Sequence, residues 1–133
     1  MNPLLLDTHA VVWYLRDPAR LSSKALEQIH RSGREGIPLF VSVISLVELV
    51  YLVEKERLPQ AALEELKHGL QDPLAAIQVL PVDSSLIETL ERIPRGSVPD
   101  MPDRIIAATA FQRDLLLITR DRRLRDCGVH TLW

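Results

Sequence analysis

The sequence lacks features that define several other classes of protein. It has one cysteine, Cys127, so it can form neither an internal disulfide nor a zinc site built from thiolates. No uninterrupted apolar stretch approaches the ~20 residues that a membrane span needs. The first apolar run is broken by Asp7 and has no basic flank, which argues against a signal peptide. We therefore expect a cytoplasmic protein.

An excess of positive charge is also missing. The 133 residues carry a formal net charge of −2, which argues against a protein held on nucleic acid by bulk positive charge alone. The densest basic segment is 120–125, where four of six residues are arginine. Such a run is ordinarily a solvated turn, but the planar guanidinium group also suits phosphate, and both interpretations stay open.

Short apolar runs alternate with helical patterns along the chain. Strands are predicted at residues 4–6, 39–41, 77–80 and 115–118, with a short fifth at 129–132. Helices are predicted at 8–15, 22–34, 42–57, 60–70, 83–93 and 103–113, the fourth stopped by Pro73. Strands without polar alternation are typical of a parallel sheet covered on both faces. The sequence thus predicts one domain, 1–133, folded as a three-layer α/β/α sandwich around a mostly parallel sheet of four to five strands.

Four acidic residues are expected at one edge of this sheet. Asp7 follows the first strand and Asp121 follows the fourth. Glu48 lies one to two turns into the helix after the second strand, and Asp103 opens the helix that leads into the fourth. Because ligands bind outside the carboxyl ends of parallel strands, we expect these carboxylates to lie near a common site.

Each acid also has a simpler, structural explanation. Asp7 is well placed to cap the helix that follows it, and Asp121 to make a turn. Asp103 lies in a first helical turn, where the helix dipole favours a negative charge. Glu48 lies three residues after Ser45, the spacing of a capping box, whereas a cap at Ser42 would leave Glu48 free.

These structural explanations weaken when the four acids are considered together. Carboxylates gathered at one end of a sheet repel one another, and such a cluster needs a cation or raised pKa values to persist. Oxygen ligands without cysteine or histidine suit Mg²⁺ or Mn²⁺ better than zinc. The chemistry that such ions ordinarily support is phosphoryl transfer or phosphodiester hydrolysis.

Four stretches of the sequence, in order, match the pattern of a known family. They are LLLDTHAVVWYL (4–15), VSVISLVEL (41–49), PDMPDRIIAATA (99–110) and LLLITRD (115–121). As an ordered set they resemble the PIN-domain nucleases and, within them, the VapC-like toxins of bacterial and archaeal toxin–antitoxin pairs. The resemblance covers essentially the whole chain.

The resemblance implies roles for particular residues. Asp7, Glu48, Asp103 and Asp121 would hold one or two Mg²⁺ or Mn²⁺ ions that activate water for attack on an RNA phosphodiester. Two further residues would support them, each with a plain alternative. The Thr119 hydroxyl would assist the acids, or Thr119 is simply a β-branched strand end; Asp100 would be an additional acid, or a solvated loop residue. His9 and Trp13 are expected to pack beside the site.

The resemblance also implies partners. A small VapB-like antitoxin would block the acidic groove through an arginine-bearing C-terminal segment, and two copies of the chain would form a homodimer. The helices within 42–70 are the natural dimer interface, because they carry more apolar residues than one buried face requires. These residues are Leu46, Leu49, Val50, Leu52 and Val53.

Three other functions compete with the nuclease. A phospho-acceptor regulatory domain needs a lysine after the last core strand, and none follows Lys67. A haloacid-dehalogenase-like phosphatase needs a second Asp two residues after the first, where this chain has His9. A catalytically silent α/β binding domain predicts loss of one or more of the four acids, and all are present.

Overall fold

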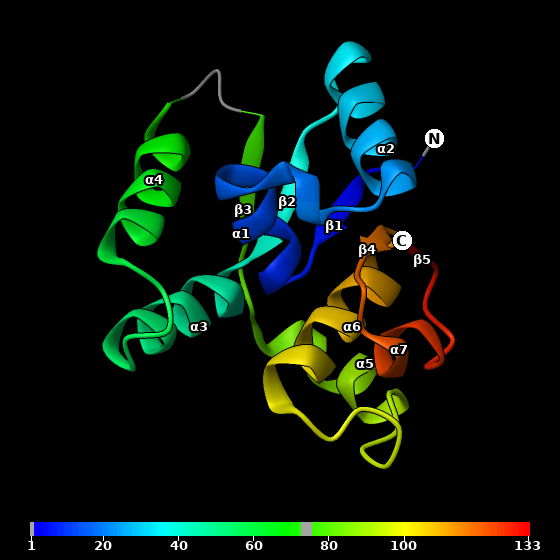
Figure 1. Ribbon diagram of the computed structural model, residues 1–133. Helices are drawn as coiled ribbons and strands as arrows, with labels where there is room; N and C mark the ends of the chain where they lie inside the picture. Colours follow the sequence, from blue (N-terminus) through cyan, green and yellow to red (C-terminus); the bar gives the residue numbers. More distant parts are fainter. Residues whose placement is uncertain (1, 73–75) are drawn as a thin grey trace.

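A five-stranded, fully parallel sheet forms the centre of the computed structural model, which describes residues 2–72 and 76–133 (Figure 1). The strands are β1 (Leu4–Leu6), β2 (Leu39–Ser42), β3 (Ile77–Leu80), β4 (Leu116–Ile118) and β5 (Thr131–Leu132). Their order is β3-β2-β1-β4-β5, with β1 central and parallel to both neighbours. The order runs outward in both directions from β1 and β4, which creates a topological switch point between them.

Helices connect the strands. They are α1 (Thr8–Arg16), α2 (Ser23–Arg34), α3 (Val43–Glu54), α4 (Gln60–Gln71), α5 (Ile87–Arg92), α6 (Met101–Arg113) and α7 (Arg122–Arg125), with single 3₁₀ turns η1 (Pro18–Arg20) and η2 (Ser84–Leu86). No helix within 2–72 and 76–133 is long and apolar enough to cross a membrane.

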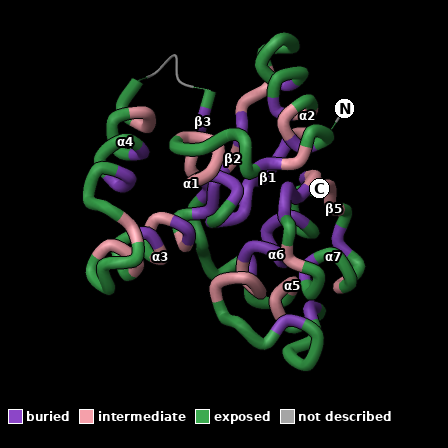
Figure 2. Tube along the Cα trace, viewed as in Figure 1, coloured by how far each residue is buried: buried purple, intermediate pink, exposed green. Residues whose placement is uncertain are grey.

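The two faces of the sheet are covered by different helices. Leu4 and Leu6 of β1 face a core shared with α1, α2 and α4, whereas Leu5 faces a core shared with α5, α6 and α7. All three leucines are fully buried, because the strand has apolar layers on both sides. Figure 2 shows the same arrangement, with a buried sheet between helices that are exposed on their outer surfaces. The predicted three-layer sandwich is confirmed.

Helix α3 carries apolar residues on its exposed side as well as on its buried side. Leu49 is 1% exposed and belongs to the core, so its predicted place in a dimer interface was wrong. Leu46, Leu52 and Val53 are half-buried. The exposed apolar side chains of α3 are instead Val43, Val47, Val50 and Tyr51. The helix therefore has an apolar outer face, composed mostly of residues that the sequence did not single out.

Several predicted boundaries differ from the structure. Helix α6 begins at Met101 rather than Asp103, because Asp100 caps it and Pro102 fits the first turn. The helix predicted at 83–93 is divided into η2 and α5. The arginine run, expected as a turn, contains the short helix α7. Pro73, the predicted stop of α4, lies outside the described residues.

Candidate active site

The switch point between β1 and β4 brings two of the predicted acids together. The backbone N–H of Asp7 donates to the carbonyl of Ile118 at 3.2 Å, so the chain leaving β1 runs beside the chain leaving β4. Asp7 follows β1 directly, and Asp121 follows β4 after two residues. Their proximity is a direct consequence of parallel pairing between these two strands.

Asp7 is the most buried acid of the site, at 6% exposure. Its Oδ1 accepts a hydrogen bond from the backbone N–H of Ala10 at 2.8 Å, which caps helix α1. Burial raises the pKa of Asp7, and the Thr119 side chain and the Ala10 N–H oppose that rise. A carboxylate has two oxygens, so capping leaves Asp7 an acceptor for other contacts.

Thr119 connects the two acids at the switch point. Its buried hydroxyl hydrogen-bonds to the Asp7 carboxylate, and its Oγ1 accepts from the backbone N–H of Asp121 at 3.0 Å. The Asp121 Oδ1 in turn caps α7 by accepting from the N–H of Arg123 at 2.8 Å. Thr119 is thus a strand-end residue that also orients acidic groups, so its two interpretations are compatible.

The carboxylate of Glu48 is hydrogen-bonded by a residue of α1, not by its own helix α3. Helix α3 is capped by Ser42, whose Oγ accepts from the N–H of Ile44 at 3.2 Å, so Glu48 takes no part in a capping box. Thr8 Oγ1 donates to Glu48 Oε1 at 2.5 Å and lies 2.9 Å from Ser45 Oγ. Because Thr8 has one hydroxyl proton, Ser45 donates in the second of these bonds. Burial raises the pKa of Glu48, and the bond from Thr8 lowers it.

Asp100 and Asp103 come from the start of α6. Asp100 is exposed and caps the helix, accepting from the N–H of Asp103 at 3.1 Å. The pKa of Asp103 rises from its ordinary 3.8 to about 7, first because of burial and then because of Asp100, Asp121, Glu48 and Asp7. Asp103 therefore experiences the summed repulsion of the other acids in the group.

These acids line one pocket with a volume of about 460 Å³. Its lining consists of Asp7, Thr8, His9, Trp13, Arg20, Glu48, Asp100, Asp103, Arg120 and Asp121. All four predicted core acids share this pocket, together with the supporting acid Asp100. Within the described ranges, no three acidic, histidine or cysteine side chains already lie close enough together to hold a metal ion.

Two further pocket residues were not singled out from the sequence. Thr8 is next to Asp7, and only the packing of α1 against α3 shows that its hydroxyl meets Glu48. Arg20 is the last residue of η1, the turn that follows α1. The signal for this turn in the sequence was Pro18, which begins it.

An open parallel sheet with an acid-lined crevice at its switch point defines an α/β protein with a carboxylate site. The chain belongs to the PIN domain family, whose sequence pattern matches residues 4–129.

Known relatives agree with this assignment. The chain is 35% identical to Ribonuclease VapC22 of Mycobacterium tuberculosis over 125 residues, which cover 94% of this chain and 92% of the relative. Two solved structures share the fold. VapBC2 from Rickettsia felis, bound to a promoter DNA fragment, gives a TM-score of 0.73 at 15% identity, covering 97% of this chain and 96% of that one. DNA-bound VapBC from Salmonella typhimurium gives 0.72 at 21% identity, covering 99% and 98%.

Proposed function

We propose that this chain is an endoribonuclease that hydrolyses RNA phosphodiester bonds with Mg²⁺ or Mn²⁺. The observation that carries the proposal is the convergence of five carboxylates on one pocket in a PIN domain. The 35% identity to a ribonuclease across nearly the whole chain supports RNA as the substrate.

The donor set fits a hard divalent cation. The lining offers carboxylate and hydroxyl oxygens, which Mg²⁺ and Mn²⁺ prefer. Burial raises the pKa of Asp103 first, and the repulsion of the neighbouring acids adds to the rise. A cation among these groups would relieve that repulsion. Mg²⁺ keeps several waters and is usually bound through one or two carboxylates. A pocket in which no three of the described acids already form a tight group can therefore still bind Mg²⁺.

In this proposal Asp7, Glu48, Asp103 and Asp121 hold the ion. When bound, the ion supplies charge stabilisation at the phosphate and an activated water. Thr119 orients the carboxylate of Asp7 and the backbone of Asp121, and Thr8 orients Glu48. Asp100 adds negative charge at the pocket rim while it caps α6.

The same proposal assigns the chain as the toxin of a toxin–antitoxin pair. A VapB-like antitoxin covers the acidic pocket with an arginine-bearing segment, since a guanidinium group pairs well with clustered carboxylates. The homology to Ribonuclease VapC22 and the fold shared with VapBC complexes support this partner. A homodimer through the outer face of α3 belongs to the same proposal.

The test is cleavage of labelled structured RNAs by the purified protein with Mg²⁺ or Mn²⁺, and with EDTA. The decisive variant is Asp7→Asn, because asparagine can still cap α1 while it removes the charge. The matched control is Asp114→Asn, which removes a charge at the far end of α6, where the backbone φ of 52° suits asparagine. We expect metal-dependent cleavage by the wild type and the control, and none by Asp7→Asn.

A silent binding domain predicts a different result. One observation favours this alternative: in the described part of the chain, no three potential metal ligands are already grouped. It predicts no cleavage of any RNA and no calorimetric binding of Mn²⁺. Binding of Mn²⁺ that Asp7→Asn weakens, without cleavage of the RNAs tried, would instead indicate a nuclease with a narrow target.

A further inference from the structure

One wall of the pocket is built from a cation stacked on an aromatic ring. The guanidinium carbon of Arg20 lies 4.7 Å from the centroid of the Trp13 ring, and both residues line the pocket. An arginine at this distance over tryptophan is attracted by the electrons of the ring and is restrained in orientation. The stack therefore presents a positive group to a cavity lined by five carboxylates, with Arg120 as the second arginine of its lining.

The chain trace brings Arg20 back over its own helix. Helix α1 ends where the N–H of Asp17 donates to the carbonyl of Trp13 at 2.8 Å. Pro18 then begins η1, and the N–H of Arg20 donates to the carbonyl of Asp17 at 3.0 Å. The turn η1 thus contacts α1, and the Arg20 side chain lies over the ring of Trp13, one helical turn before the end of α1.

Two other aromatic rings pack against Trp13. His9 lies one turn earlier on α1, with ring centroids 5.7 Å apart, and Trp133 after β5 contacts Trp13 at the same distance. Trp13 is half-buried, so its ring is fixed by packing while part of it still faces the pocket. A stack supported in this way restrains Arg20 before any ligand arrives.

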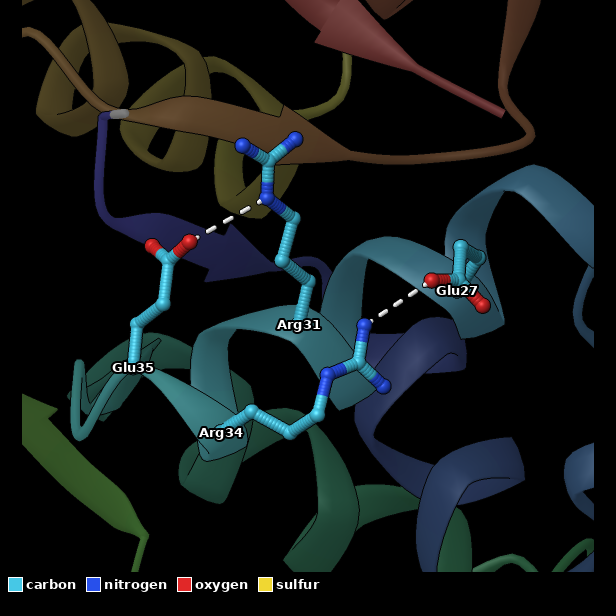
Figure 3. Close-up of polar contacts among 4 residues, drawn as sticks. All are labelled: Glu27, Arg31, Arg34 and Glu35. Atoms are coloured by element: carbon cyan, nitrogen blue, oxygen red, sulfur yellow. Dashed lines mark hydrogen bonds and ion pairs between the residues drawn. The ribbon is translucent and has the colours of Figure 1, made fainter.

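Arg20 differs from the arginines of the neighbouring helix α2. Figure 3 shows Arg34 paired with Glu27 and Arg31 paired with Glu35. The nitrogen–oxygen distances of these ion pairs are 3.0 Å and 3.3 Å. In the ranges 2–72 and 76–133, the Arg20 guanidinium has an aromatic partner and no carboxylate partner. Its hydrogen-bond donors are therefore available to an anion at the pocket.

We propose that Arg20, oriented by Trp13, binds a backbone phosphate of the RNA next to the bond that is cleaved. This inference rests on the proposed ribonuclease function and assigns the substrate contact that the acids cannot make. The planar fork of arginine suits two phosphate oxygens, and its charge offsets the repulsion between RNA and the acidic pocket. Trp13 acts as a positioning residue, because it touches Arg20 rather than the phosphate.

The test is binding rather than cleavage, so that its result is independent of catalysis. Anisotropy of a short, labelled single-stranded RNA is measured with Asp7→Asn protein in Mg²⁺, over a range of salt concentrations. Adding Arg20→Gln should weaken binding about tenfold, as expected for a charged hydrogen bond. It should also reduce the slope of log K against log salt by roughly 0.7, one phosphate contact on a single strand.

Two variants serve as controls for Arg20. Arg34→Gln removes the same charge from an exposed ion pair on α2 and should leave binding within about twofold of the parent. Arg20→Lys keeps the charge and loses the planar fork, so the affinity should fall while the salt slope stays unchanged. Equal binding by the Arg20→Gln and Arg34→Gln proteins would overturn the proposal.

The role of Trp13 is tested by a double-mutant cycle. Trp13→Leu should weaken binding, Trp13→Phe should restore most of it, and Arg20→Gln should cost little more once Trp13→Leu is present. Fully additive losses would contradict a positioning role.

The outcomes for the phosphate contact and for the ribonuclease function are distinguishable. If the wild type cleaves no RNA and binds no Mn²⁺, but Arg20→Gln still weakens RNA binding, the ribonuclease proposal fails and Arg20 is a phosphate contact of an RNA-binding domain. If the wild type cleaves RNA normally and Arg20→Gln leaves binding unchanged, the phosphate contact fails and the ribonuclease proposal stands.

Discussion

The hydroxyl of Thr8 donates to Glu48 Oε1 at 2.5 Å and so joins the first turn of α1 to the middle of α3. Ser45 completes the chain of bonds by donating to Thr8 at 2.9 Å. Both hydroxyl residues are buried, so each bond replaces one that water would otherwise make. The position of Glu48 at the pocket therefore depends on a residue of another helix.

Replacing Thr8 by valine should disturb both stability and the acid. The change leaves the buried Ser45 hydroxyl without its acceptor, which costs about 1–3 kcal/mol in the free energy of unfolding. It also removes a bond that lowers the pKa of Glu48, so that pKa should rise further. We expect the acidic limb of the pH–rate profile to move to higher pH. Thr8→Ser, which keeps the hydroxyl, should retain the wild-type profile; a profile unchanged in Thr8→Val would contradict this role.

The raised pKa of Asp103 predicts an unusual pH dependence of stability in the metal-free protein. An acid whose folded-state pKa is raised contributes its full stability below the unfolded pKa, near 3.8, and loses it as the pH rises through about 7. Asp103→Asn removes that loss. Its melting temperature should exceed that of the wild type by a few degrees at pH 8, and the difference should shrink toward pH 5. Differential scanning fluorimetry in EDTA measures this, with Asp114→Asn as the control.

Adding metal should reverse the order of the melting temperatures of the wild type and Asp103→Asn. A ligand that binds only the folded state raises stability in proportion to the logarithm of its concentration. Mn²⁺ should therefore raise the melting temperature of the wild type, and raise that of Asp103→Asn much less. The same experiment with Asp114→Asn should follow the wild type. A shift of equal size in all three proteins would place the ion elsewhere.

The outer face of α3 predicts a dimer contact. Val47 is 44% exposed and Tyr51, one turn later, is 58% exposed, so a charge at this face should disfavour association. Val47→Glu should give a monomer by light scattering where the wild type gives a dimer. Phe111→Glu is the matched control, because Phe111 is 51% exposed on α6 and should not affect the mass. A wild-type monomer at all concentrations would refute the interface.

The sheet is readable from the sequence because its strands are short apolar runs. Residues 4–6 are predicted with their observed bounds, since all three leucines there are buried. Residues 77–80 are also predicted with their observed bounds, although Gln78 in this edge strand is exposed. The helix at the arginine run is not predicted, because four residues carry no periodic signal. Its one local marker is Asp121 at the cap position, a residue that suits a turn equally well.

The acids of the pocket can be placed because strand ends in a parallel sheet meet at one edge. Asp7 and Asp121 can each cap a helix and line the pocket, since each caps its helix with only one of its two carboxylate oxygens. The contact between Thr8 and Glu48 joins residues 40 positions apart and depends on how two helices pack. The stack of Arg20 on Trp13 depends on the turn η1. Spacing along the chain gives no signal for either contact.

The contact between Trp13 and Trp133 has a practical consequence. These are the two tryptophans of the chain, and their rings lie 5.7 Å apart, with Trp13 in the wall of the pocket. Indole emission from this protein therefore originates almost entirely at one location, and quenchers or ligands that enter there will alter it directly. The molecule carries its own optical reporter, which can follow occupancy of the pocket without any added label.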